Sequence, residues 1–249
     1  ILLDFTTSPA VAVFGILVVA FVLVAATVWS TPELVSRVCV QRSDLRPRFT
    51  VPPHLRRMLA ARMPAIIAGW ATNGLFLALG AGLVQTELGG STHTHAGIVI
   101  AALAIAGVVA SRLLQQRSAR TISLYAATAL ALGTVASIGA LALHSYPAYV
   151  AAVAVVGSGF GTAFLGVLRT LMPHTAASER AAVMAVVYTI SYLAFGVPTI
   201  IAGLLVPLLT LTGTMIVLGA VIVVLSLVAT VLRARIPDRH LSRSRGGGS

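Results

Sequence analysis

The sequence contains no lysine, since all 17 of its Lys and Arg residues are arginine, and it has only six acidic residues. Charged residues make up 9% of the 249 residues, against about 25% in a typical soluble domain. Hydrophobic residues make up 58%, and the mean hydropathy is +0.99. A chain with so little charge cannot cover this much apolar surface in water, which argues against a water-soluble enzyme or binding module.

Catalytic and metal-binding motifs are also missing. The single cysteine, Cys39, excludes an intrachain disulfide and a CxxC metal site. The absence of lysine excludes a Walker phosphate loop, and neither HExxH nor GxSxG occurs. His93 and His95 have only Glu87 nearby in the sequence, which is too few ligands for a metal. We therefore expect no enzyme, no cofactor and no metal, and a polar loop at these histidines.

Long hydrophobic runs are what the sequence has instead. A helix needs about 20 apolar residues to cross a hydrocarbon core of about 30 Å, and backbone amides in lipid must pair within the segment. The runs that satisfy this carry no charged residue in their middle. The sequence thus predicts an all-α, polytopic transmembrane helix bundle of seven spans, at residues 9–29, 63–84, 93–111, 121–143, 146–168, 181–208 and 211–232.

The arginines give the orientation of these spans. All 17 lie in four segments, residues 30–62, 112–120, 169–180 and 233–245, and alternating crossings put the four on one side. The positive-inside rule assigns that side to the cytoplasm. We therefore expect a multi-pass protein of the cell membrane, with residue 1 outside and the C-terminus cytoplasmic. The net charge of +11 then reflects topology and contact with anionic membrane lipids rather than nucleic-acid binding.

A long basic segment separates the first predicted span from the other six. Residues 30–62 are basic and contain four prolines, so we expect a cytoplasmic linker between residues 1–29 and the six spans of residues 63–235. Within it, residues 54–62 fit either a short helix on the membrane surface or a solvated loop. Pro64 is expected in the first turn of the second span, and residues 236–249 are expected to form a flexible cytoplasmic tail.

Three stretches in this arrangement carry a family resemblance. Residues 62–84 (RMPAIIAGWATNGLFLALGAGLV), 157–180 (GSGFGTAFLGVLRTLMPHTAASER) and 192–203 (YLAFGVPTIIAG) are similar to the seventh, tenth and eleventh helices of the major facilitator superfamily. The chain resembles that family from its sixth helix onward, most closely its bacterial efflux transporters. Residues 107–120 depart from the family's basic loop motif, of which only Arg117 and Arg120 remain.

The resemblance implies a fold, a function and a partner. The six spans after the linker would form two inverted three-helix units. Residues 1–29 would be the last helix of an N-terminal half whose remainder precedes Ile1, and that half would be the partner. The function would be secondary active transport of a small amphipathic solute by alternating access, in the efflux direction if the subfamily holds. The alternatives are a seven-span scaffold or assembly protein that does not transport and a membrane-embedded enzyme, against which the missing catalytic groups argue.

Polar and aromatic residues within the spans are the candidates for a substrate path. Residues four apart share a helix face, so each aromatic pair on the tenth-like and eleventh-like spans presents one surface. The alternatives are an interhelical hydrogen bond for the amide and an aromatic packing stripe for the pairs. The candidates are Trp70, Asn73, Phe160, Phe164, Tyr188 and Tyr192.

Glycine and proline positions indicate close packing and bending. Gly157 and Gly161 form a GxxxG pair inside an apolar span, which favours close helix approach over phosphate binding. Gly196, Pro198 and Gly203 interrupt a later span, where proline removes a backbone hydrogen bond. That interruption fits either a hinge for alternating access or a static kink.

The predicted topology is tested with Cys39, the only thiol. Because Cys39 lies in the arginine-rich linker, we expect a membrane-impermeant maleimide to label it only after intact cells are permeabilised. Labelling from outside intact cells would reverse the orientation.

Overall fold

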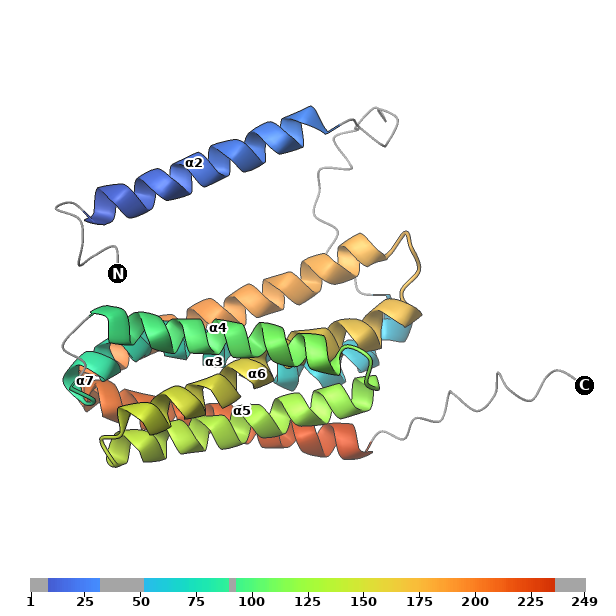
Figure 1. The fold of residues 1–249 in the computed structure, drawn as a ribbon. Coiled ribbons are helices and arrows are strands. Elements are labelled where there is room, and N and C mark those ends of the chain that lie inside the picture. The colour runs from blue at the N-terminus through green and yellow to red at the C-terminus, as the bar shows by residue number, and fades with distance from the viewer. Residues whose placement is uncertain (1–8, 32–51, 90–92, 236–249) are drawn as a thin grey trace, which may run out of the picture. The chain divides into compact units, whose positions relative to one another are not determined.

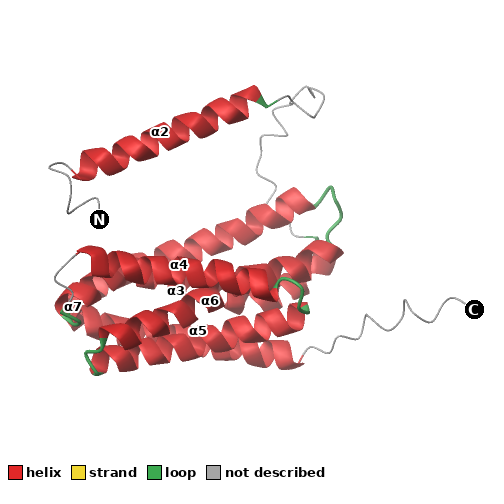
Figure 2. Cartoon of the chain, viewed as in Figure 1, coloured by secondary structure: helices red, strands yellow, loops and turns green. Residues whose placement is uncertain are grey.

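The structure is a computed structural model that describes residues 9–31, 52–89 and 93–235. Every regular element in these ranges is a helix (Figure 2). The chain divides into two compact units, residues Ile1–Arg48 and Phe49–Ser249. The described helix of the first unit is α2 (Pro9–Ser30), which carries no charged residue. It is long enough to cross a membrane by itself.

The second unit is a bundle of long helices joined by short turns (Figure 1). Six helices of the described residues, α2 included, are long and apolar enough to cross a membrane, which is the pattern of a multi-pass membrane protein. The helices of the bundle, with one short 3-10 turn, are α3 (Pro53–Thr86), α4 (His93–Leu114), α5 (Ala119–Ala142), α6 (Tyr146–Leu171), η1 (Met172–His174) and α7 (Arg180–Arg235).

Helix starts follow local chemistry. Ser118 caps α5, because its side-chain oxygen accepts a hydrogen bond from the backbone N–H of Thr121 at 3.1 Å. Pro147 lies in the first turn of α6, where its missing N–H leaves no helix hydrogen bond unmade. Pro64 instead lies inside α3, well past its first turn, so the expectation that it begins a helix is wrong.

That difference has its cause in packing at the start of α3. The helix begins at Pro53, so residues 54–62 form neither a separate surface helix nor a loop. Leu55 and Leu59 are buried and pack with Leu171 of α6 and Val187 of α7. Tertiary contacts thus start this helix ten residues before the expected start of its span, while the division into a linker and a six-span half stays a prediction. The rest of the expected linker, residues 32–51, and the expected tail, residues 236–249, lie outside the described residues.

The longest helix, α7, corresponds to two expected spans. Its 56 residues would measure about 84 Å if straight, nearly three times a hydrocarbon core of about 30 Å. Thr210 has non-helical angles (φ 66°, ψ 171°) and divides α7 into two helical segments. The chain reverses there (orange and red in Figure 1). The break falls between residues 208 and 211, where the sequence predicts it.

The ends of the bundle differ in charge. The starts of α3 and α7, the α4–α5 turn and the ends of α6 and α7 meet at one end (Figure 1). Every arginine between residues 53 and 235 is in or near these segments. The opposite end contains the α3–α4 and α5–α6 turns and Thr210. Among the described residues at that end, the charged one is Glu87. We refer below to the arginine end and the opposite end.

Thr210 itself combines strain with a cap. Its φ and ψ fall in a region that is essentially restricted to glycine and costs about 1–3 kcal/mol for other residues. Its Oγ1 accepts a hydrogen bond from the backbone N–H of Gly213 at 3.3 Å, which caps the second segment of α7.

Replacing Thr210 therefore has opposite effects with glycine and alanine. Thr210→Gly relieves the strain at a capping cost of a few tenths of a kcal/mol, so we expect thermal stability in detergent to rise by about 1 kcal/mol. Thr210→Ala keeps the strain and loses the cap, so stability falls by about 1 kcal/mol. Thr189→Gly, within the regular part of α7, is the control and should be destabilising. A drop in melting temperature for Thr210→Gly as large as that for Thr189→Gly would contradict the strained geometry.

Candidate substrate-binding site

Five aromatic residues from three helices form one cluster. The ring of Trp70 on α3 lies 5.4 Å from that of Phe160 and 6.1 Å from that of Phe164, both on α6 and both edge-on. It also lies 6.0 Å from the ring of Tyr192 on α7. Such geometries are favourable for aromatic pairs. The candidates that the sequence offers as separate helix faces therefore meet around Trp70.

The α7 side of this aromatic cluster is open. Tyr188 stacks on Tyr192 at 6.4 Å and reaches Phe164 at 5.9 Å. Tyr188 is 41% exposed and Tyr192 is 66% exposed. The indole Nε1 of Trp70 is buried without a hydrogen-bond partner, which ordinarily costs about 1–3 kcal/mol. The aromatic cluster thus presents an apolar surface, and the buried indole N–H of Trp70 remains available as a hydrogen-bond donor.

Asn73 does not join the aromatic cluster but lines a groove beside it. The groove has a volume of about 580 Å³ and lies between α3, α4 and α6. Phe160 lines it too and so belongs to both features. Within the described residues the Asn73 side chain has no hydrogen-bond partner, whereas an amide that served interhelical packing would have one. The groove is lined by Asn73, Leu77, Ile100, Leu103, Ala104, Gly107, Val108, Ser111, Arg112, Gln115, Phe160, Gly161 and Leu165.

Backbone contact between α4 and α6 forms one wall of this groove. A Cβ placed on Gly157 would lie 2.7 Å from the Cα of Leu103, and one on Gly161 would lie 2.8 Å from the Cα of Gly107. Both distances are shorter than real Cβ contacts, so only glycine fits. The two residues of the predicted GxxxG pair lie at this crossing.

The three positions predicted to interrupt a later span, Gly196, Pro198 and Gly203, do not lie at the break in α7. A Cβ on Gly196 or Gly203 would meet nothing within 4 Å, so neither glycine marks a close approach. Pro198 lies inside the first segment of α7, and the non-helical residue of that element is Thr210. The break in α7 is thus located away from these three residues, and their expected role as a hinge stays a prediction.

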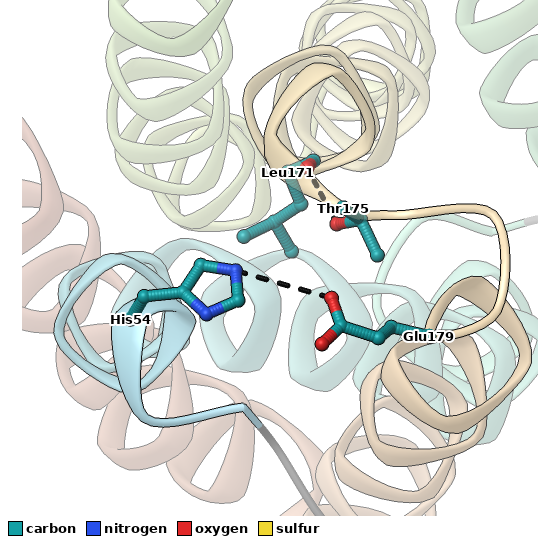
Figure 3. Close-up of polar contacts among 4 residues, drawn as sticks. All are labelled: His54, Leu171, Thr175 and Glu179. Atoms are coloured by element: carbon teal, nitrogen blue, oxygen red, sulfur yellow. Dashed lines mark hydrogen bonds and ion pairs between the residues drawn. The ribbon is translucent and has the colours of Figure 1, made fainter.

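Polar contacts hold the arginine end together. His54 Nε2 of α3 lies 3.9 Å from Oε2 of Glu179, just before α7 (Figure 3). The hydroxyl of Thr175 donates to the carbonyl of Leu171 at 2.7 Å and closes the turn after α6. The guanidinium of Arg62 is buried and donates to the Ser123 hydroxyl of α5 at 3.4 Å. The His54 side chain is 58% exposed, so its pair with Glu179 links α3 and α7 without adding much stability.

At the opposite end, His95 packs against Tyr146. The two rings are 4.9 Å apart, and the Tyr146 hydroxyl donates to the backbone carbonyl of His95. The side chain of His93 lies outside the described part of the chain. No group of three metal-ligating side chains occurs among the residues that the structure describes.

The sequence missed the α4 side of the groove. Ser111, Arg112 and Gln115 line it near the arginine end, but in the sequence they read as the end of a span and a basic loop. The available signal was that Gln115 follows Arg112 by three residues and Ser111 by four, which places Gln115 beside both if the helix continues. Comparison of the chain with protein-family models, with curated proteins and with solved structures finds no match.

The α4–α6 crossing generates a paired prediction. Gly157→Ala forces a methyl group into the backbone of α4, so we expect a loss of about 1–3 kcal/mol in stability. Gly196→Ala adds the same methyl group in open space inside a helix and should be neutral or stabilising by up to about 1 kcal/mol. Melting temperatures in one detergent separate the two, and equal effects would contradict the close approach of α4 and α6.

Proposed function

We propose that the chain is the C-terminal portion of a secondary active transporter similar to the major facilitator superfamily, and that it moves a small amphipathic solute by alternating access. The observation that carries this proposal is the convergence of Trp70, Phe160, Phe164, Tyr188 and Tyr192 beside the groove that holds Asn73. Sites that take small amphipathic molecules combine apolar and aromatic walls with a few polar groups.

The arrangement of the helices supports the same proposal. If each segment of α7 crosses the membrane, the chain has seven crossings, and residues 53–235 supply six of them. Three crossings before the α5–α6 turn and three after it match two three-helix units of inverted topology. The arginine end would face the cytoplasm, and the protein would reside in the plasma membrane. By the same resemblance, this unit works with a second six-helix unit, and efflux is the direction we favour.

The proposal is tested by flux through the full-length protein in proteoliposomes. The probes are ethidium, a cationic amphiphile, and dodecanoate carrying a fluorescent nitrobenzoxadiazole group, an anionic one. We expect protein-dependent flux of at least one probe. Because the Asn73 amide is unpaired within the described residues and faces the groove, Asn73→Ala should lower that flux about tenfold, the effect of losing one hydrogen bond of about 1.4 kcal/mol, at an unchanged melting temperature.

The control variant is Thr128→Ala. Thr128 is an exposed polar residue of α5 whose hydroxyl bonds to the carbonyl of Leu124 in its own helix, so its removal should leave flux unchanged. Flux of Asn73→Ala equal to that of the wild type, per folded molecule, would remove Asn73 from the path. If neither probe is moved by well-folded protein, the scaffold alternative replaces transport.

A further inference from the structure

One face of α4 runs along the whole groove. Its lining residues on α4 run from Ile100 to Arg112, with Gln115 in the turn just after the helix, and their three- and four-residue steps keep the side chains on one helix face. Twelve residues of helix correspond to about 18 Å. The groove is therefore elongated parallel to the helix, not a round pocket.

The character of this face changes along its length. From Ile100 to Val108 the α4 lining is apolar or glycine, and from Ser111 onward it is polar. The polar part contains Arg112, in the last turn of α4 at the arginine end. An elongated groove with an apolar stretch and one charged end is complementary to an amphiphile that lies along it.

No described acidic residue opposes the charge of Arg112 at this end. Within the described residues Arg112 makes no hydrogen bond or ion pair. The acidic residues of the described ranges are Glu87, at the opposite end, and Glu179, which faces His54. Neither lines the groove. A planar guanidinium in this position matches a carboxylate or phosphate headgroup, to which it can donate two parallel hydrogen bonds.

The size of the groove limits the apolar part of such a ligand. Its volume of about 580 Å³, divided by a length of about 18 Å, corresponds to a mean cross-section of about 32 Å². That cross-section accommodates one extended hydrocarbon chain. The volume also falls within the range of about 300–1,000 Å³ typical of small-molecule sites.

We propose that the groove binds a single-chain anionic amphiphile, with its headgroup on Arg112 and its chain lying along α4 toward Ile100. If the chain transports as proposed above, this amphiphile is its substrate. Binding of the amphiphile in the groove can be measured without transport. Gln115 and Ser111 flank the headgroup, and Asn73 offers a further polar contact from α3.

The experiment measures binding of radiolabelled palmitate to the purified full-length protein in nanodiscs of zwitterionic phosphatidylcholine. Arg112→Gln should weaken binding about tenfold or more, because it removes a charge-assisted interaction, and Arg112→Lys should retain part of the affinity. The matched control is Arg180→Gln, which removes an exposed arginine at the same end but outside the groove, and should change affinity less than twofold. Melting temperatures confirm that each variant is folded.

A second pair of variants tests the position of the chain. Ala104 lines the groove, whereas Ile98 does not line it and is 45% exposed, on the side of α4 opposite to Ile100. Ala104→Trp should fill the groove and abolish palmitate binding, and Ile98→Trp should leave it intact. Equal binding by these two variants would overturn the assignment.

Two further ligands test whether the headgroup must be charged and whether the ligand must have a single chain. Uncharged methyl palmitate should bind at least about tenfold more weakly than palmitate, by the same loss of a charge-assisted contact. Phosphatidylglycerol, a two-chain anionic lipid, should not compete when added to the nanodisc. Methyl palmitate binding as tightly as palmitate, unchanged palmitate binding by Arg112→Gln, or full competition by phosphatidylglycerol would each overturn the proposal. If palmitate binds as expected but is not carried across proteoliposomes, transport fails and the binding site stands.

Discussion

The contact between the backbones of α4 and α6 is the interaction on which the groove depends. Helices in lipid gain no hydrophobic free energy by associating, so close van der Waals packing between small residues must hold them together. Gly157 and Gly161 let α6 touch α4 at Leu103 and Gly107. Because Gly107 and Gly161 also line the groove, the residues that bring the two helices together leave part of its wall without side chains.

Hydropathy predicted most of the helical architecture because the membrane constraint acts on sequence directly. Every expected span lies within a helix to within one residue, and even the break near residue 210 was located, since polar and helix-terminating residues cluster there. The start of α3 was missed because tertiary packing, and not hydropathy, determines it. Residues 54–62 are too polar to read as a span, and their helix is stabilised by Leu55 and Leu59 packing on α6 and α7, contacts between distant residues that a single sequence does not reveal.

The candidate site was predicted in its parts and not in its arrangement. Helical periodicity correctly groups Phe160 with Phe164 and Tyr188 with Tyr192, because it fixes which residues share a face. Periodicity does not fix which helix that face meets, so the position of Trp70 at the centre of both pairs emerged only from the fold. Arg112 was overlooked because an arginine at the end of a span is fully explained by topology. Its position at the mouth of an apolar groove gives it a second interpretation.

The most direct test of this account is to locate the ligand on α4. Palmitate with a photoreactive diazirine near its chain end, irradiated with the full-length protein in nanodiscs, marks the residues that the chain touches, and mass spectrometry of peptides identifies them. The account predicts labelling at the apolar end of the groove, at Ile100 and Ala104, which unlabelled palmitate suppresses. Labelling confined to Ile98, which is exposed outside the groove lining, or labelling that excess palmitate does not reduce, would contradict it.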